Sequence, residues 1–146
     1  MTKNKFFLAL LLLLGLGGLC LRLNRDWFAP KRIQISHRVS PWLREPHNRA
    51  TPVVFSFDQH YKFKEVKVVV ASEIATNKYA HALWHLISPS NSVLTTSFTY
   101  GEPFQGMSSQ IKDAIADPLQ PGVLYRLLVK TADVEASHDF DITIRR

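Results

Sequence analysis

The chain has 146 residues, of which 46% are hydrophobic and 21% are charged, and its formal net charge is +6. This length suits one domain of ordinary size behind an N-terminal segment, and the hydrophobic content is typical of a folded chain rather than a disordered one. Most of the positive charge lies before residue 50, because residues 50–146 carry nine basic and ten acidic side chains. A nucleic-acid-binding domain needs a basic face of its own, so we expect no nucleic-acid partner.

Residues 1–23 are predicted to form a hydrophobic helix. A basic start with Lys3 and Lys5 precedes a run from Phe6 to Leu21 that contains no charged or strongly polar side chain. This run is longer than the apolar part of most signal peptides and shorter than the roughly 20 residues of a typical membrane span. We expect a signal anchor that contacts the membrane through residues 6–21 and leaves the domain outside the cytoplasm, in the periplasm or at the cell surface. The alternative is a cleaved signal peptide and a secreted domain.

Residues 24–50 are interpreted as a basic juxtamembrane linker, because its prolines would interrupt a long helix. The alternation in residues 32–36 is compatible with a first short strand. Two roles are open for the basic side chains near the helix: a solvated tether, or contact with anionic lipid head groups. The side chains concerned are Arg22, Arg25, Lys31 and Arg32.

Residues 51–146 are predicted to form one all-β domain. Alternation of apolar and polar residues, with turn-forming residues between the runs, predicts strands at 52–58, 63–71, 81–88, 93–100, 122–130 and 137–144. In the second of these, Val66, Val68 and Val70 are expected to point inward. Residues 109–116 are either a short helical turn or a distorted strand. With about seven strands and no helix long enough to connect parallel strands, the pattern predicts an antiparallel sandwich.

Residues 119–132 combine a turn and the strand that follows it. Leu119 precedes a Pro121-Gly122 turn, and Tyr125 begins the alternation of the strand. This spacing resembles the corresponding stretch of fibronectin type III and related immunoglobulin-like domains. The resemblance implies that the leucine closes the end of the sandwich. It also implies that Tyr125 forms a tyrosine corner, a buried ring whose hydroxyl binds upstream backbone. Trp84 is the expected core tryptophan, although it lies later in the chain than in many such domains.

No segment carries a catalytic or cofactor-binding signature, so we predict no catalytic, cofactor-binding or metal-binding residues and no enzymatic activity. On one strand, His81 and His85 would lie about 13 Å apart, which is too far for both to bind one zinc ion. Asp139 and Asp141 alternate along a strand that is expected to face solvent, where carboxylates usually aid solubility.

Aromatic residues beside the predicted loops offer the remaining functional signal. Tyr61, Tyr79, Tyr100 and Phe104 would either pack under the loops or form a recognition surface, and Tyr100 and Phe104 mark the candidate recognition loop. The leading hypothesis is a membrane-tethered, extracytoplasmic sandwich domain that binds an unknown protein partner or supports the cell envelope. The alternative is a small carbohydrate-binding module.

Overall fold

The computed structural model describes residues 3–25, 31–40, 53–90 and 92–143 of the chain. The chain divides into two compact units, Met1–Lys31 and Arg32–Arg146. Most of the linker predicted at residues 24–50 lies outside the described residues.

The first unit is built on one helix, α1 (Lys3–Leu23), of 21 residues. At 1.5 Å per residue it is about 31 Å long, close to the thickness of the hydrocarbon core of a bilayer. None of its side chains is buried against protein. Within the described residues it is the one helix long and apolar enough to cross a membrane, a property that signal sequences near an N-terminus share. Both the anchor and the signal-peptide alternatives are compatible with this helix.

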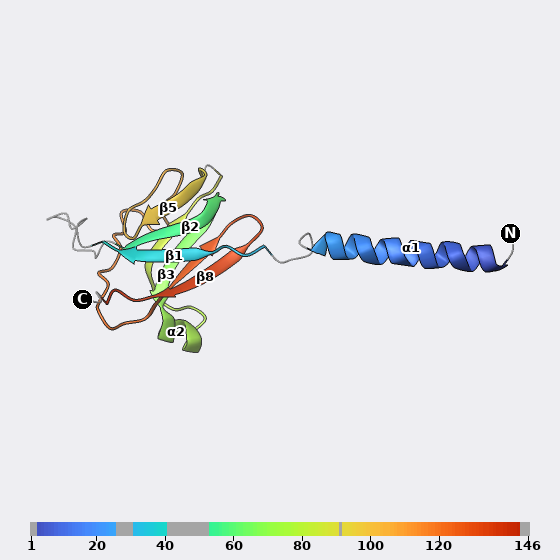
Figure 1. The fold of residues 1–146 in the computed structure, drawn as a ribbon. Coiled ribbons are helices and arrows are strands. Elements are labelled where there is room, and N and C mark those ends of the chain that lie inside the picture. Colours follow the sequence, from blue (N-terminus) through green and yellow to red (C-terminus); the bar gives the residue numbers. More distant parts are fainter. Residues whose placement is uncertain (1–2, 26–30, 41–52, 91, 144–146) are drawn as a thin grey trace. The chain divides into compact units, whose positions relative to one another are not determined.

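The second unit contains two antiparallel sheets (Figure 1). The three-stranded sheet has the order β1-β2-β5, and the five-stranded sheet has the order β6-β4-β3-β7-β8. The strands are β1 (Ile35–Val39), β2 (Val53–Tyr61), β3 (Glu65–Val70), β4 (Ala82–Ile87), β5 (Thr95–Thr99), β6 (Ser108–Ser109), β7 (Tyr125–Lys130) and β8 (Glu135–Phe140). The prediction of antiparallel β-structure behind an N-terminal helix is therefore confirmed.

Aromatic side chains fill the space between the two sheets. Phe55 of β2 meets Phe140 of β8 edge to face, with ring centroids 4.9 Å apart. Trp84 of β4 lies 5.9 Å from Phe98 of β5 and is 4% exposed. Because each of these pairs joins one sheet to the other, the aromatic core holds the sheets together.

The first strand begins at Ile35, three residues after the expected start at Arg32. In β3, Val66 and Val68 lie in the core and the partly buried Val70 packs against it, as expected. Val69 is fully buried as well, although its register partner on β7 is Arg126 of the outer face. At this end of β3 the register with β4 shifts between Val68 and Val69, and the strand leads directly into a short helix, α2 (Ala71–Thr76).

Residues 109–116 form neither a helix nor a continuous strand. The strand β6 ends at Ser109, and turns and bends follow it. The two isoleucines that suggested a helix are largely exposed, Ile111 at 70% and Ile115 at 86%. A helix here would have had no apolar surface on which to bury them.

Candidate functional site

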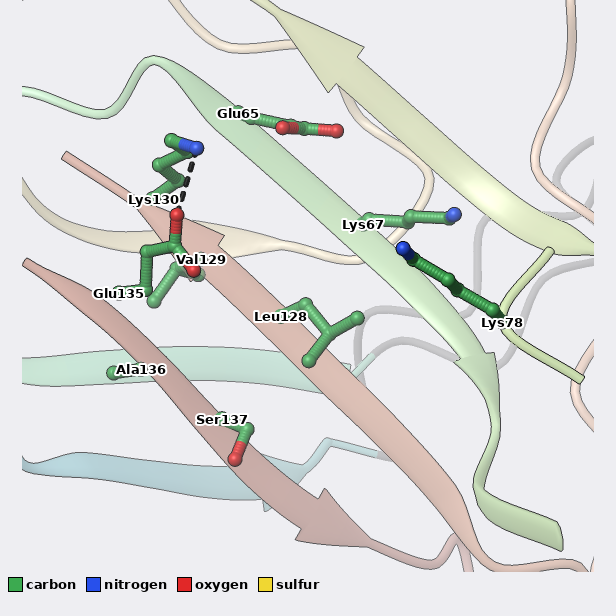
Figure 2. Close-up of a pocket in the computed structure, with 9 residues that line it drawn as sticks. All are labelled: Glu65, Lys67, Lys78, Leu128, Val129, Lys130, Glu135, Ala136 and Ser137. Carbon is green, nitrogen blue, oxygen red and sulfur yellow. Dashed lines mark ion pairs between the residues drawn. The ribbon is translucent and has the colours of Figure 1, made fainter. Parts of the chain in front are cut away.

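The outer face of the five-stranded sheet carries a groove of ≈ 650 Å³, which we call the lysine groove. It lies over β3, β7 and β8, and Lys78 from the loop that follows α2 also lines it (Figure 2). Its lining residues are Glu65, Lys67, Lys78, Leu128, Val129, Lys130, Glu135, Ala136 and Ser137.

Strand alternation places most of these side chains on the outer face, whereas Val129 and Ala136 point toward the core. Because successive residues of a strand point to opposite faces, Leu127 and Val129 enter the core while Leu128 and Lys130 point outward. The register then aligns outward residues in rows across the sheet. One row contains Lys67, Leu128 and Ser137 of β3, β7 and β8, side by side.

Most charged side chains of this face form ion pairs with one another. Lys130 Nζ lies 2.7 Å from Glu135 Oε1, and this hydrogen bond raises the pKa of Lys130. His85 Nε2 lies 2.7 Å from Glu65 Oε1 across the neighbouring strands β3 and β4. Lys130 and Glu135 therefore neutralise each other, and Glu65 has His85 as its hydrogen-bond partner.

A third ion pair, between Arg126 and Asp139, lies on the same outer face. Arg126 binds both carboxylate oxygens of Asp139, at 2.6 and 2.8 Å. The hydrogen bond from Arg126 holds the pKa of Asp139 below its usual range. Such a two-point contact fixes the geometry of both side chains as well as their charge. Asp139 is therefore committed to a structural partner.

Lys67 and Lys78 differ from the other charged residues of the groove. Within the part of the chain that the structure describes, neither ammonium group has a carboxylate within ion-pair distance. Lys67 comes from the middle of β3, and Lys78 comes from the loop after α2 at the same end of the groove (Figure 2). Lys67 and Lys78 are therefore the charged groups of the groove without an ion-pair partner in the described residues, and the three lysines and two glutamates of its lining give it a formal charge of +1.

This arrangement suits binding better than catalysis. Two ammonium groups attract a carboxylate, Leu128 offers an apolar contact, and the exposed hydroxyl of Ser137 can donate or accept a hydrogen bond. The groove runs over three neighbouring strands, which suits an extended segment of another chain.

The structure places both residues of the candidate recognition loop under the surface. Tyr100 is 1% exposed, and its hydroxyl donates to the carbonyl oxygen of Asp117 at 2.7 Å. Phe104 is half-buried and stacks on Phe98, with ring centroids 4.9 Å apart. These two rings pack under the loops and do not form an exposed recognition surface. Tyr79, by contrast, is 84% exposed.

The residues expected to have structural roles lie around one turn. Leu119 is buried in the core, and Gly122 has a φ of +80° in the turn after Pro121. The ring of Tyr125 is 3% exposed, and its hydroxyl accepts a hydrogen bond from the backbone amide of Gln120 at 2.7 Å. Trp84, on β4, is buried against Tyr100.

The histidines considered for a metal site have separate partners. His81 contacts Asp117 at 3.1 Å and is largely exposed, whereas His85 contacts Glu65. Within the described residues no three metal-ligating side chains come together. The basic side chains Arg22, Arg25, Lys31 and Arg32 are all exposed, which leaves them accessible to solvent or to lipid.

Comparison with protein-family models, with curated proteins and with solved structures finds no match to this chain.

Sequence reasoning did not find the lysine groove. The outward direction of Lys67 follows from the alternation of β3, but Lys78 lies in a loop without periodicity. No local signal indicates that these two lysines share a site or that Glu65 and Glu135 have other partners.

Proposed function

We propose that this chain is a non-enzymatic, membrane-tethered binding domain with an immunoglobulin-like fold, exposed outside the cytoplasm. Its binding surface is the lysine groove, and its partner is a protein that presents an extended acidic segment. The observation that carries the proposal is the pair of lysines, Lys67 and Lys78, in a groove whose carboxylates have other partners.

The strand order supports an immunoglobulin-like fold. In such domains the first, second and fifth strands share one sheet. The third strand and the two strands at the C-terminal end share the other sheet. Here β1, β2 and β5 form one sheet, and β3 pairs with β7, which pairs with β8. The hydroxyl of Tyr125, bound five residues upstream at the start of β7, supports the tyrosine corner of the same family.

The apolar helix α1 supports the tether. Its length matches a bilayer, and its side chains have no protein surface to cover. A tether also means that a weaker affinity of the groove is enough for binding, because a membrane that confines both partners raises their effective concentration.

The proposal is tested by photocrosslinking in intact membranes. A photoreactive amino acid at position 137, on the exposed β8 side of the groove, should give one discrete crosslinked species. The double charge reversal Lys67→Glu and Lys78→Glu should abolish that species, because two attractive contacts with a carboxylate become repulsive.

The matched control reverses two exposed lysines outside the groove, Lys62→Glu and Lys112→Glu, which changes the net charge equally. This control should retain the crosslink. Loss of the crosslink in both double variants would show a general charge effect and contradict a site in the groove. Equal crosslinking in the groove variant and the wild type would contradict it as well.

A further inference from the structure

Two histidines meet where the edges of the two sheets approach each other. Nδ1 of His37, on β1, lies 2.8 Å from Nε2 of His138, on β8, and the ring centroids are 5.1 Å apart. The strands β1 and β8 belong to different sheets, so no backbone ladder joins them. Among the described residues, this contact is the one side-chain hydrogen bond between the two strands.

The surroundings of the pair are mostly apolar. Both rings are half-buried, and the ring of His37 lies 5.8 Å from that of Phe140. The cross-strand neighbour of His37 on β2 is Phe55, and that of His138 on β7 is Leu127. Polar rings in such a place satisfy each other, because few other partners are within reach.

Nearby charged groups lie mainly on the outer faces of the sheets. On β1, Arg38 is exposed and points away from the core, and on β8 Asp139 is held by Arg126 of β7. From β2 and β7, the described residues that face the pair carry no charge. Burial and the neighbouring His37 lower the pKa of His138, while Asp139 opposes this in part.

We propose that His37 and His138 form a pH-sensitive latch that holds the first strand of the domain against the last strand and releases it when both rings are protonated. This inference is independent of the lysine groove, since His138 lies on the opposite face of β8 from Ser137 and a different pair of side chains is involved.

The proton count explains why the latch depends on pH. When both rings are neutral, one N–H donates to the unprotonated nitrogen of the other ring. One added proton leaves an imidazolium N–H facing a neutral acceptor, so the hydrogen bond persists and gains charge assistance. A second proton places an N–H on both facing nitrogens, which removes the acceptor and brings two positive charges together.

The direction of the effect follows from proton linkage. With β1 released, the two rings are apart, so the proton taken up by one no longer opposes the protonation of the other. In the closed state the second proton is disfavoured, so the open state binds more protons as the pH falls. Opening should therefore increase by up to about tenfold for each pH unit over which one extra proton is taken up.

Hydrogen exchange on the full chain in membrane nanodiscs tests the latch. Exchange of the β1 amides, corrected for intrinsic rates, is compared with that of the β3 amides as the pH falls from about 7.5 to about 5, the range in which histidine titrates. We expect β1 to lose protection relative to β3 by at least about tenfold.

Two variants and one control distinguish the latch from general acid sensitivity. His138→Phe and His37→Gln each remove one titrating ring, so β1 protection should no longer change with pH more than that of β3. His60→Gln, at an exposed position on β2, should behave like the wild type. The proposal is overturned if wild-type β1 and β3 respond equally to pH, or if the selective loss in β1 persists in both latch variants.

Discussion

Tyr100 and Tyr125 bind the same short backbone segment from the two sheets. The hydroxyl of Tyr100, which directly follows β5, donates to the carbonyl oxygen of Asp117, and the hydroxyl of Tyr125, on β7, accepts from the amide of Gln120. Both distances are 2.7 Å. The segment that leads into β7 is thus fixed from both layers of the domain.

Replacing Tyr125 with phenylalanine should lower the free energy of unfolding by about 1 kcal/mol, because the backbone amide of Gln120 loses a part-buried hydrogen bond while the ring packing is kept. Denaturant unfolding of the full chain in detergent, followed by fluorescence, measures this change. Tyr79→Phe, at an 84% exposed position, should stay within about 0.5 kcal/mol of the wild type. An unchanged stability of Tyr125→Phe would show that this hydrogen bond does not support the fold.

The two tyrosines should be coupled energetically. When either hydroxyl is removed, the segment from Asp117 to Gln120 becomes more mobile. The remaining hydrogen bond is then formed to a less ordered backbone, so it should stabilise the domain less. In a double-mutant cycle of Tyr100→Phe and Tyr125→Phe we expect a coupling energy of about 0.5 kcal/mol or more. Strict additivity would mean that the two bonds stabilise the domain separately.

Tyr100 should make the domain sensitive to alkaline pH. Burial raises the pKa of Tyr100 well above its ordinary value of 10.0, so the folded state keeps the phenol neutral where the unfolded chain ionises. The stability associated with Tyr100 is present below about pH 10 and declines above it, by up to about 1.4 kcal/mol per pH unit. In Tyr100→Phe this part of the slope should be missing, whereas Tyr79→Phe should retain the wild-type slope.

The position of Gly122 has room for a side chain, but its positive φ disfavours any residue that carries a Cβ. Its φ of +80° is costly for a residue with a side chain, yet a Cβ at this position would have no atom within 4 Å. Gly122→Ala should therefore destabilise the domain by about 1 kcal/mol through conformation alone. Gly122→Asn should cost less, because asparagine adopts positive φ more readily. Equal losses for the two variants would point to a cause other than φ.

The helix α1 should keep the full-length chain in the membrane after alkaline carbonate extraction. Its 21 residues suit a bilayer span, and nothing in the described protein covers its side chains. Changing Leu12 and Leu13 to arginine should release the chain, because each charge at the centre of the helix costs about 3 kcal/mol on insertion. A wild-type chain that is shortened at its N-terminus and soluble would instead indicate a cleaved signal peptide.

Strand positions could be predicted from the sequence because strand alternation is a local property. The pattern around Val53, Phe55 and Phe57 specifies one buried face without knowledge of any neighbour, and the structure buries all three residues. Alternation alone does not predict the burial of Val69, whose register partner on β7 is Arg126 of the outer face and which is nonetheless fully buried. Alternation indicates which side chains of a strand share a face, whereas the exposure of that face depends on the rest of the fold.

The functional candidates could not be predicted in this way, since their members are far apart in the chain. Lys67 and Lys78 come from a strand and a separate loop, and 101 residues separate His37 from His138. Whether a charged residue is paired depends on the register of the neighbouring strands, which no single strand reveals. Glu135 is bound to Lys130, and so does not balance Lys67 or Lys78, because β7 and β8 pair in that register.

The sequence alone determined the class of the protein: an apolar helix before a near-neutral, antiparallel β-domain, with a proline-glycine turn that leads to a buried tyrosine. These features depend on residues within about a dozen positions of one another, where hydrophobic periodicity and turn chemistry act directly. Only the tertiary structure decided which strands are neighbours, which charges are paired and which histidines meet. Those contacts depend on sheet order and register, because the packing of the aromatic core brings distant segments together.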